Sequence, residues 1–107
     1  MTDWIELIRH LILQENYLVS LHGYEEMEKD DIFLSDIVEN MRNAEPIEAY
    51  PDYHKGPCCL FLVNNAEARP IHVLWGLAKG SSEPAVLITA YRPDPARWSD
   101  DFRRRGK

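Results

Sequence analysis

The residue types that could do chemistry gather late in the chain, along two expected strands. Strand alternation places His72 on the polar side of its strand. On the next strand, alternation puts Thr89 and Tyr91 on one side together with Leu87. His72, Thr89 and Tyr91 therefore form a polar site if the two strands pair in the matching register. A slip of one residue would exchange the faces, so a structural histidine at position 72 is the alternative.

Four basic residues lie around the ends of these strands: Arg69, Lys79, Arg92 and Arg97. A cation near a histidine and a tyrosine can cleave a phosphodiester without a metal. One group takes the proton of a ribose 2′-hydroxyl, the cation neutralises the charge that grows on phosphorus, and another group protonates the leaving oxygen. We assign Arg69 to catalysis, and Lys79, Arg92 and Arg97 to RNA binding. Solvated basic residues at strand ends are the alternative interpretation.

A second candidate histidine opens an expected helix. Glu25 and Glu26 follow His22 within one turn and could orient its imidazole, so we assign His22 to catalysis; a structural histidine near a helix start is the alternative. The acidic run from residue 25 to 31 lacks the Asp-x-Asp-x-Asp-Gly spacing of a calcium loop. Cys58 and Cys59 are adjacent, so on a strand they point to opposite faces and cannot grip a metal together. We therefore expect no metal and no cofactor.

The elements that must position these residues change character at Pro46. Before it, helical periodicity predicts a helix capped by Asp3 and ending near Asn16, and a short helix from residue 22 to 29. Ser35 is expected to cap a third helix, and residues 17–21 form an extended link or an edge strand. After it, the period of two predicts strands at 47–50, 58–63, 70–77 and 85–91, followed by a short helix at 96–105.

This order predicts a single α+β domain over residues 1–107, with N-terminal helices packed on one face of an antiparallel four-stranded sheet and a basic C-terminal tail. Charge follows the same division. Residues 1–54 hold thirteen acidic and three basic residues, whereas residues 55–107 hold five and nine, for formal charges of −10 and +4. No apolar run approaches the roughly 20 residues that a membrane span needs, so we expect a cytoplasmic protein without a membrane partner.

Several segments resemble the domain-of-unknown-function family 4258. They are residues 22–32, Ser35-Asp36-Ile37, Arg69-Pro-Ile-His72-Val-Leu-Trp, Val86-Leu-Ile-Thr89-Ala-Tyr91, and Arg92 to Trp98. By position, His22 matches the family histidine of the second helix, and Thr89 and Tyr91 match polar residues of its last strand. The resemblance extends over roughly residues 17–105.

The resemblance implies a fold related to RelE-like bacterial toxins, which cut messenger RNA without a metal. It also implies a cognate antitoxin as partner, often one with a zinc finger. We therefore expect a toxin-antitoxin toxin that acts as a metal-independent endoribonuclease on mRNA. The alternative is a non-catalytic protein-interaction module on the same fold, which the acidic second helix and the net charge of −6 favour.

Overall fold

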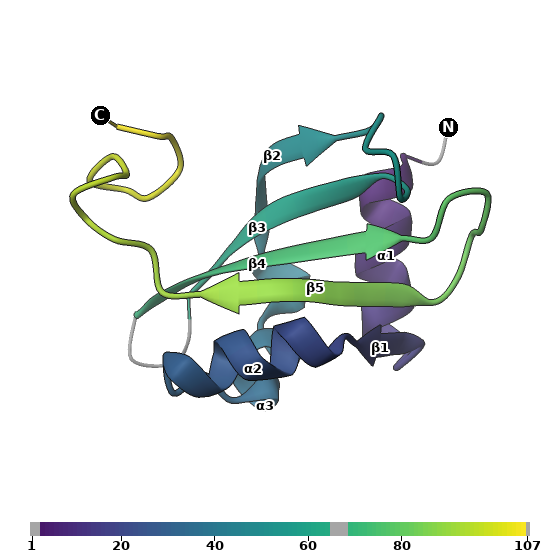
Figure 1. Cartoon of the computed structure of the whole chain (residues 1–107), viewed down its shortest axis with the longest axis horizontal. Helices are drawn as coiled ribbons and strands as arrows, with labels where there is room; N and C mark the ends of the chain where they lie inside the picture. Colours follow the sequence, from purple (N-terminus) through teal and green to yellow (C-terminus); the bar gives the residue numbers. More distant parts are fainter. Residues whose placement is uncertain (1–2, 65–68, 107) are drawn as a thin grey trace.

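A five-stranded sheet forms the centre of the protein, and helices cover one of its faces (Figure 1). The computed structural model describes residues 3–64 and 69–106. The helices are α1 (Trp4–Leu13), α2 (Leu21–Lys29), α3 (Leu34–Val38) and the 3₁₀ turn η1 (Met41–Asn43). The strands are β1 (Tyr17–Val19), β2 (Glu45–Tyr50), β3 (Cys58–Asn64), β4 (Pro70–Leu77) and β5 (Ala85–Tyr91). Within the described ranges, no helix is long and apolar enough to cross a membrane.

The first helix begins where its sequence predicts and ends earlier. The Asp3 carboxylate accepts a hydrogen bond from the backbone N–H of Ile5, at 3.0 Å, and so caps the first turn. The helix ends at Leu13 rather than near Asn16. Glu15 adopts a left-handed conformation with φ of 62°, which reverses the chain directly into β1.

The second helix is fastened to the sheet at its N-terminus. The Ser20 hydroxyl accepts from the N–H of Gly23 at 2.9 Å and donates to the carbonyl of Ile88 at 3.1 Å. One side chain thus caps α2 and holds it beside β5. The expected Ser35 cap of α3 is wrong, because the helix begins at Leu34 and the preceding Phe33 makes no side-chain capping bond.

The sheet has the strand order β1-β5-β4-β3-β2. The expectation of four antiparallel strands is therefore incomplete, because the edge strand β1 adds a fifth that runs parallel to β5, with Tyr17 opposite Ala85. The other three pairings are antiparallel. A three-residue strand paired across more than sixty residues carries no local turn signal, which is why the sequence left it open as a link or an edge strand.

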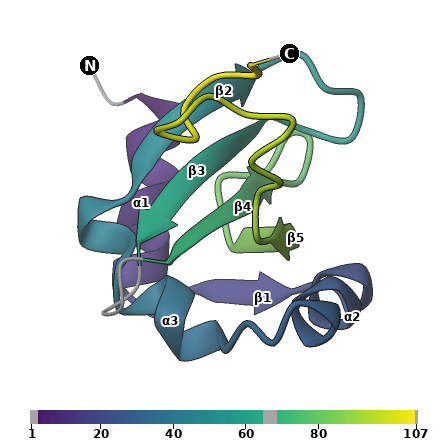
Figure 2. The ribbon, with the colours of Figure 1, turned by 90° about the vertical axis from the view of Figure 1, so that its left-hand side faces the viewer.

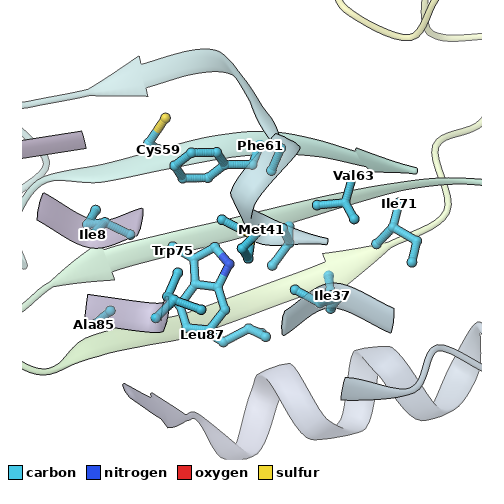
Figure 3. Close-up of a cluster of buried hydrophobic side chains, with 14 of the residues drawn as sticks. Ile8, Ile37, Met41, Cys59, Phe61, Val63, Ile71, Trp75, Ala85 and Leu87 are labelled. Atoms are coloured by element: carbon cyan, nitrogen blue, oxygen red, sulfur yellow. The ribbon is translucent and has the colours of Figure 1, made fainter. Parts of the chain in front are cut away.

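The hydrophobic core lies between the helices and one sheet face, with Trp75 at its centre (Figure 3). Phe61 and Trp75 come from the sheet and are fully buried, as is Ile8 from α1. The adjacent cysteines point to opposite faces, as alternation predicts, and only Cys59 belongs to this core. Burial raises the pKa of Cys59 to about 12, so its thiol is protonated and inert at neutral pH.

The pairing of β4 with β5 contains an irregularity that corrects one expectation. Leu74 lies opposite Thr89, but the next residue, Trp75, lies opposite Leu87. Ile88 is therefore the extra residue of a bulge, and the alternation shifts by one position there. Leu87 and Ala90 both face the core, so the expectation that Leu87 shares the face of Thr89 and Tyr91 is wrong.

The C-terminal tail, residues 92–106, crosses from the end of β5 toward β2 as a series of turns (Figure 2). The helix expected at 96–105 does not form. Side chains instead bond the backbone locally: Asp94 accepts from the N–H of Ala96 and Asp101 from the N–H of Arg103. Such bonds compete with helical ones, and Pro93 and Pro95 supply no donors.

Candidate functional site

His72 and Tyr91 lie directly opposite each other on β4 and β5, on the sheet face that points away from the core. The Nδ1 atom of His72 is 3.3 Å from the Tyr91 hydroxyl, and the two rings meet edge to face with centroids 5.4 Å apart. The register therefore brings together the two side chains that alternation placed on one face. It does so at the end of the sheet where β4 begins and β5 ends.

The tail seals His72 on its outer side. The side chain of His72 has no solvent exposure, and its Nε2 lies 2.8 Å from the carbonyl oxygen of Phe102. The Trp98 ring stands edge to face against the imidazole, with centroids 4.3 Å apart. His72 is therefore closed to direct contact with a large substrate.

The contacts of His72 determine which of its nitrogens carries the proton. A carbonyl oxygen can only accept, so Nε2 holds the proton and donates it to Phe102. Nδ1 of the neutral ring is then free to accept from the Tyr91 hydroxyl. Burial lowers the pKa of His72, although the bond to the Phe102 carbonyl partly opposes this, so the neutral ring is favoured. Burial likewise raises the pKa of Tyr91 and keeps it a phenol.

Two arginines clamp the tail onto β2. Arg105 donates to both carboxylate oxygens of Glu48, at 3.0 and 3.1 Å, and its guanidinium lies 4.8 Å from the centre of the Trp98 ring. Arg103 binds both oxygens of Glu45, with Nη2 at 2.9 Å from Oε1. Burial would raise the pKa of Glu48, but hydrogen bonds from Tyr50 and Arg105 lower it overall. Because each guanidinium makes two parallel hydrogen bonds to one carboxylate, these pairs fix the orientation of the tail on β2 as well as its distance.

A basic hollow opens beside the sealed histidine. Its volume is about 260 Å³, and it is lined by Tyr91, Arg92, Asp94, Arg97, Trp98 and Arg105. The Nε and Nη1 atoms of Arg92 are buried, and neither has a hydrogen-bond partner in the described part of the chain. Arg105 pairs with Glu48 and Arg97 with Asp94, so among the described residues Arg92 is the arginine of this hollow that forms no ion pair.

The model of the family described as a domain of unknown function, DUF4258, matches residues 19–92. The chain belongs to the DUF4258 family. It matches none of the curated proteins and none of the solved structures with which it was compared.

The DUF4258 match includes His72, Tyr91 and Arg92, the last of which is the final matched residue. The tail that covers His72 follows the matched region, as α1 precedes it. Within the family region, Arg92 contacts the C-terminal end of α2. Its backbone N–H donates a hydrogen bond of 2.9 Å to the carboxylate of Asp30, the C-cap residue of that helix. The DUF4258 region thus supplies the sheet side of the hollow, and the tail supplies Arg97, Trp98 and Arg105.

The other candidate residues of the chain lie at both ends of the sheet. Thr89 is half-buried on the same face as His72, opposite Leu74. Arg69 is exposed just before β4, at the His72 end of that strand, and Arg97 is exposed in the tail, where its Nε lies 4.0 Å from Asp94. Lys79 lies at the opposite end of β4, bonded through its backbone to Lys55.

His22 is also removed from the pair. It is exposed near the start of α2, where its interaction is with Glu26 along the helix. The geometry therefore joins His72, Tyr91, Arg92 and Arg97, and leaves Lys79 and His22 outside.

Sequence reasoning did not find the tail contacts of the site. The sequence predicts a short helix and a basic tail for the segment that contains Trp98, Phe102 and Arg105. One feature of the sequence could have indicated these contacts. Arg103 and Arg105 have the two-residue spacing of an extended segment, and they pair with Glu45 and Glu48 of β2. Among the described residues, no group of three or more His, Cys, Asp or Glu side chains is placed to hold a metal ion.

Proposed function

We propose that this protein is a metal-independent endoribonuclease that binds an RNA phosphate in the hollow beside Tyr91. The observation that carries the proposal is the Arg92 guanidinium, which lines the hollow and has two nitrogens, Nε and Nη1, with no hydrogen-bond partner among the described residues. An unsatisfied buried polar group costs about 1–3 kcal/mol, and a charged one more, so such a site favours an anion. Arg97 and Arg105 line the same hollow, but Arg97 lies near Asp94 and Arg105 pairs with Glu48, so Arg92 is the main candidate to meet a phosphate.

The chemistry follows from the protonation of the Tyr91 and His72 pair. As the ribose 2′-hydroxyl attacks the adjacent phosphorus, Tyr91 accepts its proton and passes its own to Nδ1 of His72. The bond between phosphorus and the 5′-oxygen breaks as Tyr91 gives its proton to that oxygen, and Nδ1 of His72 returns its proton to Tyr91. The products are a 2′,3′-cyclic phosphate and a 5′-hydroxyl end, so no water and no metal enter the step.

Each side chain has a separate part in this scheme. Tyr91 touches the substrate, and Arg92 neutralises the charge that grows on the phosphoryl oxygens. His72 is a positioning residue that acts through Tyr91, since the tail closes it from the substrate. The sealed position of His72 thus fits a relay better than direct attack on RNA.

The test is cleavage of a single-stranded RNA by the purified protein in the presence of a metal chelator. We expect products with cyclic phosphate ends, and a loss of about 10²–10⁴-fold in rate for Tyr91→Phe, the range for a general acid or base. Arg42→Gln is the control for Arg92→Gln. Arg42 is an exposed arginine on η1 that does not line the hollow.

Absence of cleavage on all RNAs tried, or an unchanged rate in Tyr91→Phe, would refute the nuclease. Loss of RNA binding in Arg92→Gln but not in Arg42→Gln, without cleavage by any variant, would instead identify a non-catalytic RNA-binding module. That second function is favoured by the tail, which leaves His72 without access to solvent.

The proposal extends to the biological class. A nuclease of this kind on an α+β fold fits the RelE-like toxins that the family resemblance suggests, with a cognate antitoxin as partner. Production of the chain alone in a bacterial host should then slow growth, and Tyr91→Phe should restore it. Normal growth with intact transcripts, at a level where the protein is detected and folded, would contradict the toxin assignment.

A further inference from the structure

Large apolar side chains are exposed on α2 and at the start of α3. Leu21 is 75% exposed, Phe33 70% and Tyr24 55%. Leu21 and Tyr24 are three residues apart on α2 and so share a helix face. Both helices lie at the bottom of the molecule in both views, below β5 (Figures 1 and 2). Clustered apolar exposure on a small domain is typical of an interaction surface.

A hollow between the two helices gives this surface a defined shape. Tyr24 and Phe33 line it together with the buried Met27 and Ile32, and its volume is about 330 Å³. The connection between α2 and α3 is held by a hydrogen bond of 2.9 Å from the N–H of Ile32 to the carbonyl of Met27. The hollow is therefore a preformed feature that can accept an apolar side chain.

The residues around the hollow are mainly acidic, which favours a positively charged occupant. Residues 21–39 contain seven acidic residues and one basic residue, a formal charge of −6. Glu28 and Asp31 line the hollow and are exposed, and neither forms an ion pair within the described ranges. An apolar hollow with an acidic rim complements a segment that carries apolar and basic residues together.

We infer that the hollow formed by α2 and α3 is a docking site for a basic amphipathic segment of a partner protein. An apolar side chain of the segment fills the space between Tyr24 and Phe33, and its lysines or arginines face Glu28 and Asp31. Helical segments that dock in this way present apolar residues three or four positions apart.

Two other occupants fit less well. A second copy of this chain, docked through the same surface, would bring a charge of −6 against −6 across a two-fold axis. RNA would meet the same repulsion from Glu28 and Asp31. The docking site uses different side chains from the hollow around Arg92, so the inference stands whether or not the protein cleaves RNA.

The test is a titration of the isotope-labelled protein, observed by NMR, with a 14-residue amphipathic peptide of leucine and lysine. A peptide with glutamate in place of lysine is the charge control. We expect shifts confined to residues 21–34 with the basic peptide, and none with the acidic one. Phe33→Ser and Tyr24→Ser should each weaken binding about tenfold, because both side chains line the hollow and would contact the docked apolar side chain.

The matched control is Tyr53→Ser, which removes another exposed aromatic side chain, 46% exposed in the segment between β2 and β3. Unchanged affinity in that variant supports the site. Three results would overturn the inference: no binding of the basic peptide, equal binding by Phe33→Ser, or shifts centred elsewhere. Light scattering that shows a dimer abolished by Phe33→Ser would also overturn it, since a second copy would then be the occupant.

Discussion

At the scale of single residues, the neutral form of His72 is part of what stabilises the fold. Its pKa is lowered in the folded protein, mainly by burial, from an ordinary value of 6.5. Between the lowered value and 6.5 the unfolded chain binds more protons than the folded one. Stability therefore rises with pH through that window and is lost as the pH falls below 6.5.

We predict that the free energy of unfolding, measured by urea denaturation, decreases as the pH is lowered from 7.5 to 5.5. The decrease is at most about 1.4 kcal/mol per pH unit below 6.5, the free energy equivalent of one unit of pKa. His72→Gln should abolish most of this dependence, whereas His10→Gln, at an exposed histidine of α1, should preserve it. An equal pH dependence in the His72 variant would show that another group is responsible.

At the scale of elements, the tail is held by two kinds of contact that differ in strength. Trp98 is only 5% exposed and packs against His72, whereas the pair between Arg103 and Glu45 is open to solvent, with 43% and 49% of the two side chains exposed. Exposed ion pairs are screened by salt and contribute little. Apolar packing of the tail is therefore its main attachment, and the arginines chiefly set its path.

We predict that Trp98→Ala lowers the free energy of unfolding by about 3 kcal/mol, in the range for loss of a buried aromatic ring. It should also make His72 reactive toward an imidazole-modifying reagent such as diethyl pyrocarbonate. Arg103→Gln should have a smaller effect, one that disappears in high salt. If His72 stays unreactive in Trp98→Ala, then the tail is not what seals it.

At the scale of the whole molecule, the two charge signs occupy different surfaces. The acidic residues of α2 and its neighbours surround the apolar hollow, whereas arginines gather around the hollow beside Tyr91. Two acidic residues at this end of the acidic segment have partners: Asp30 accepts the N–H of Arg92, and Glu26 pairs with Lys29 at 2.8 Å. A protein with a net charge of −6 thus still has a hollow lined by three arginines.

Because the arginines are confined to one hollow, we predict that few phosphates are contacted and that the affinity for RNA falls only weakly as salt concentration rises. For contacts to about two phosphates, the logarithm of the association constant should fall with the logarithm of salt concentration with a slope near −1.4. Arg92→Gln should reduce the slope by about 0.7, measured by fluorescence anisotropy with a short labelled RNA. An unchanged slope in that variant would place the phosphate contacts elsewhere.

The sequence by itself determined the features that depend on local periodicity. Alternation placed His72 and Tyr91 on the polar side of their strands, and the Asp3 cap fixed the start of α1. The matching of residues 19–92 to one family also depends on sequence alone. These features follow from the backbone geometry of single helices and strands, which is the same in any fold.

Only the tertiary structure decided the features that join distant segments. Contacts between residues far apart in the chain produce three of these features. They are the parallel pairing of β1 with β5, the bulge at Ile88 and the packing of the tail against His72. Such contacts depend on how apolar faces pack and on which polar groups meet in space, and neither has a local signature. For that reason the sequence indicated a histidine and a tyrosine on one face, and the fold decided that the tyrosine meets the basic hollow while the histidine lies sealed behind it.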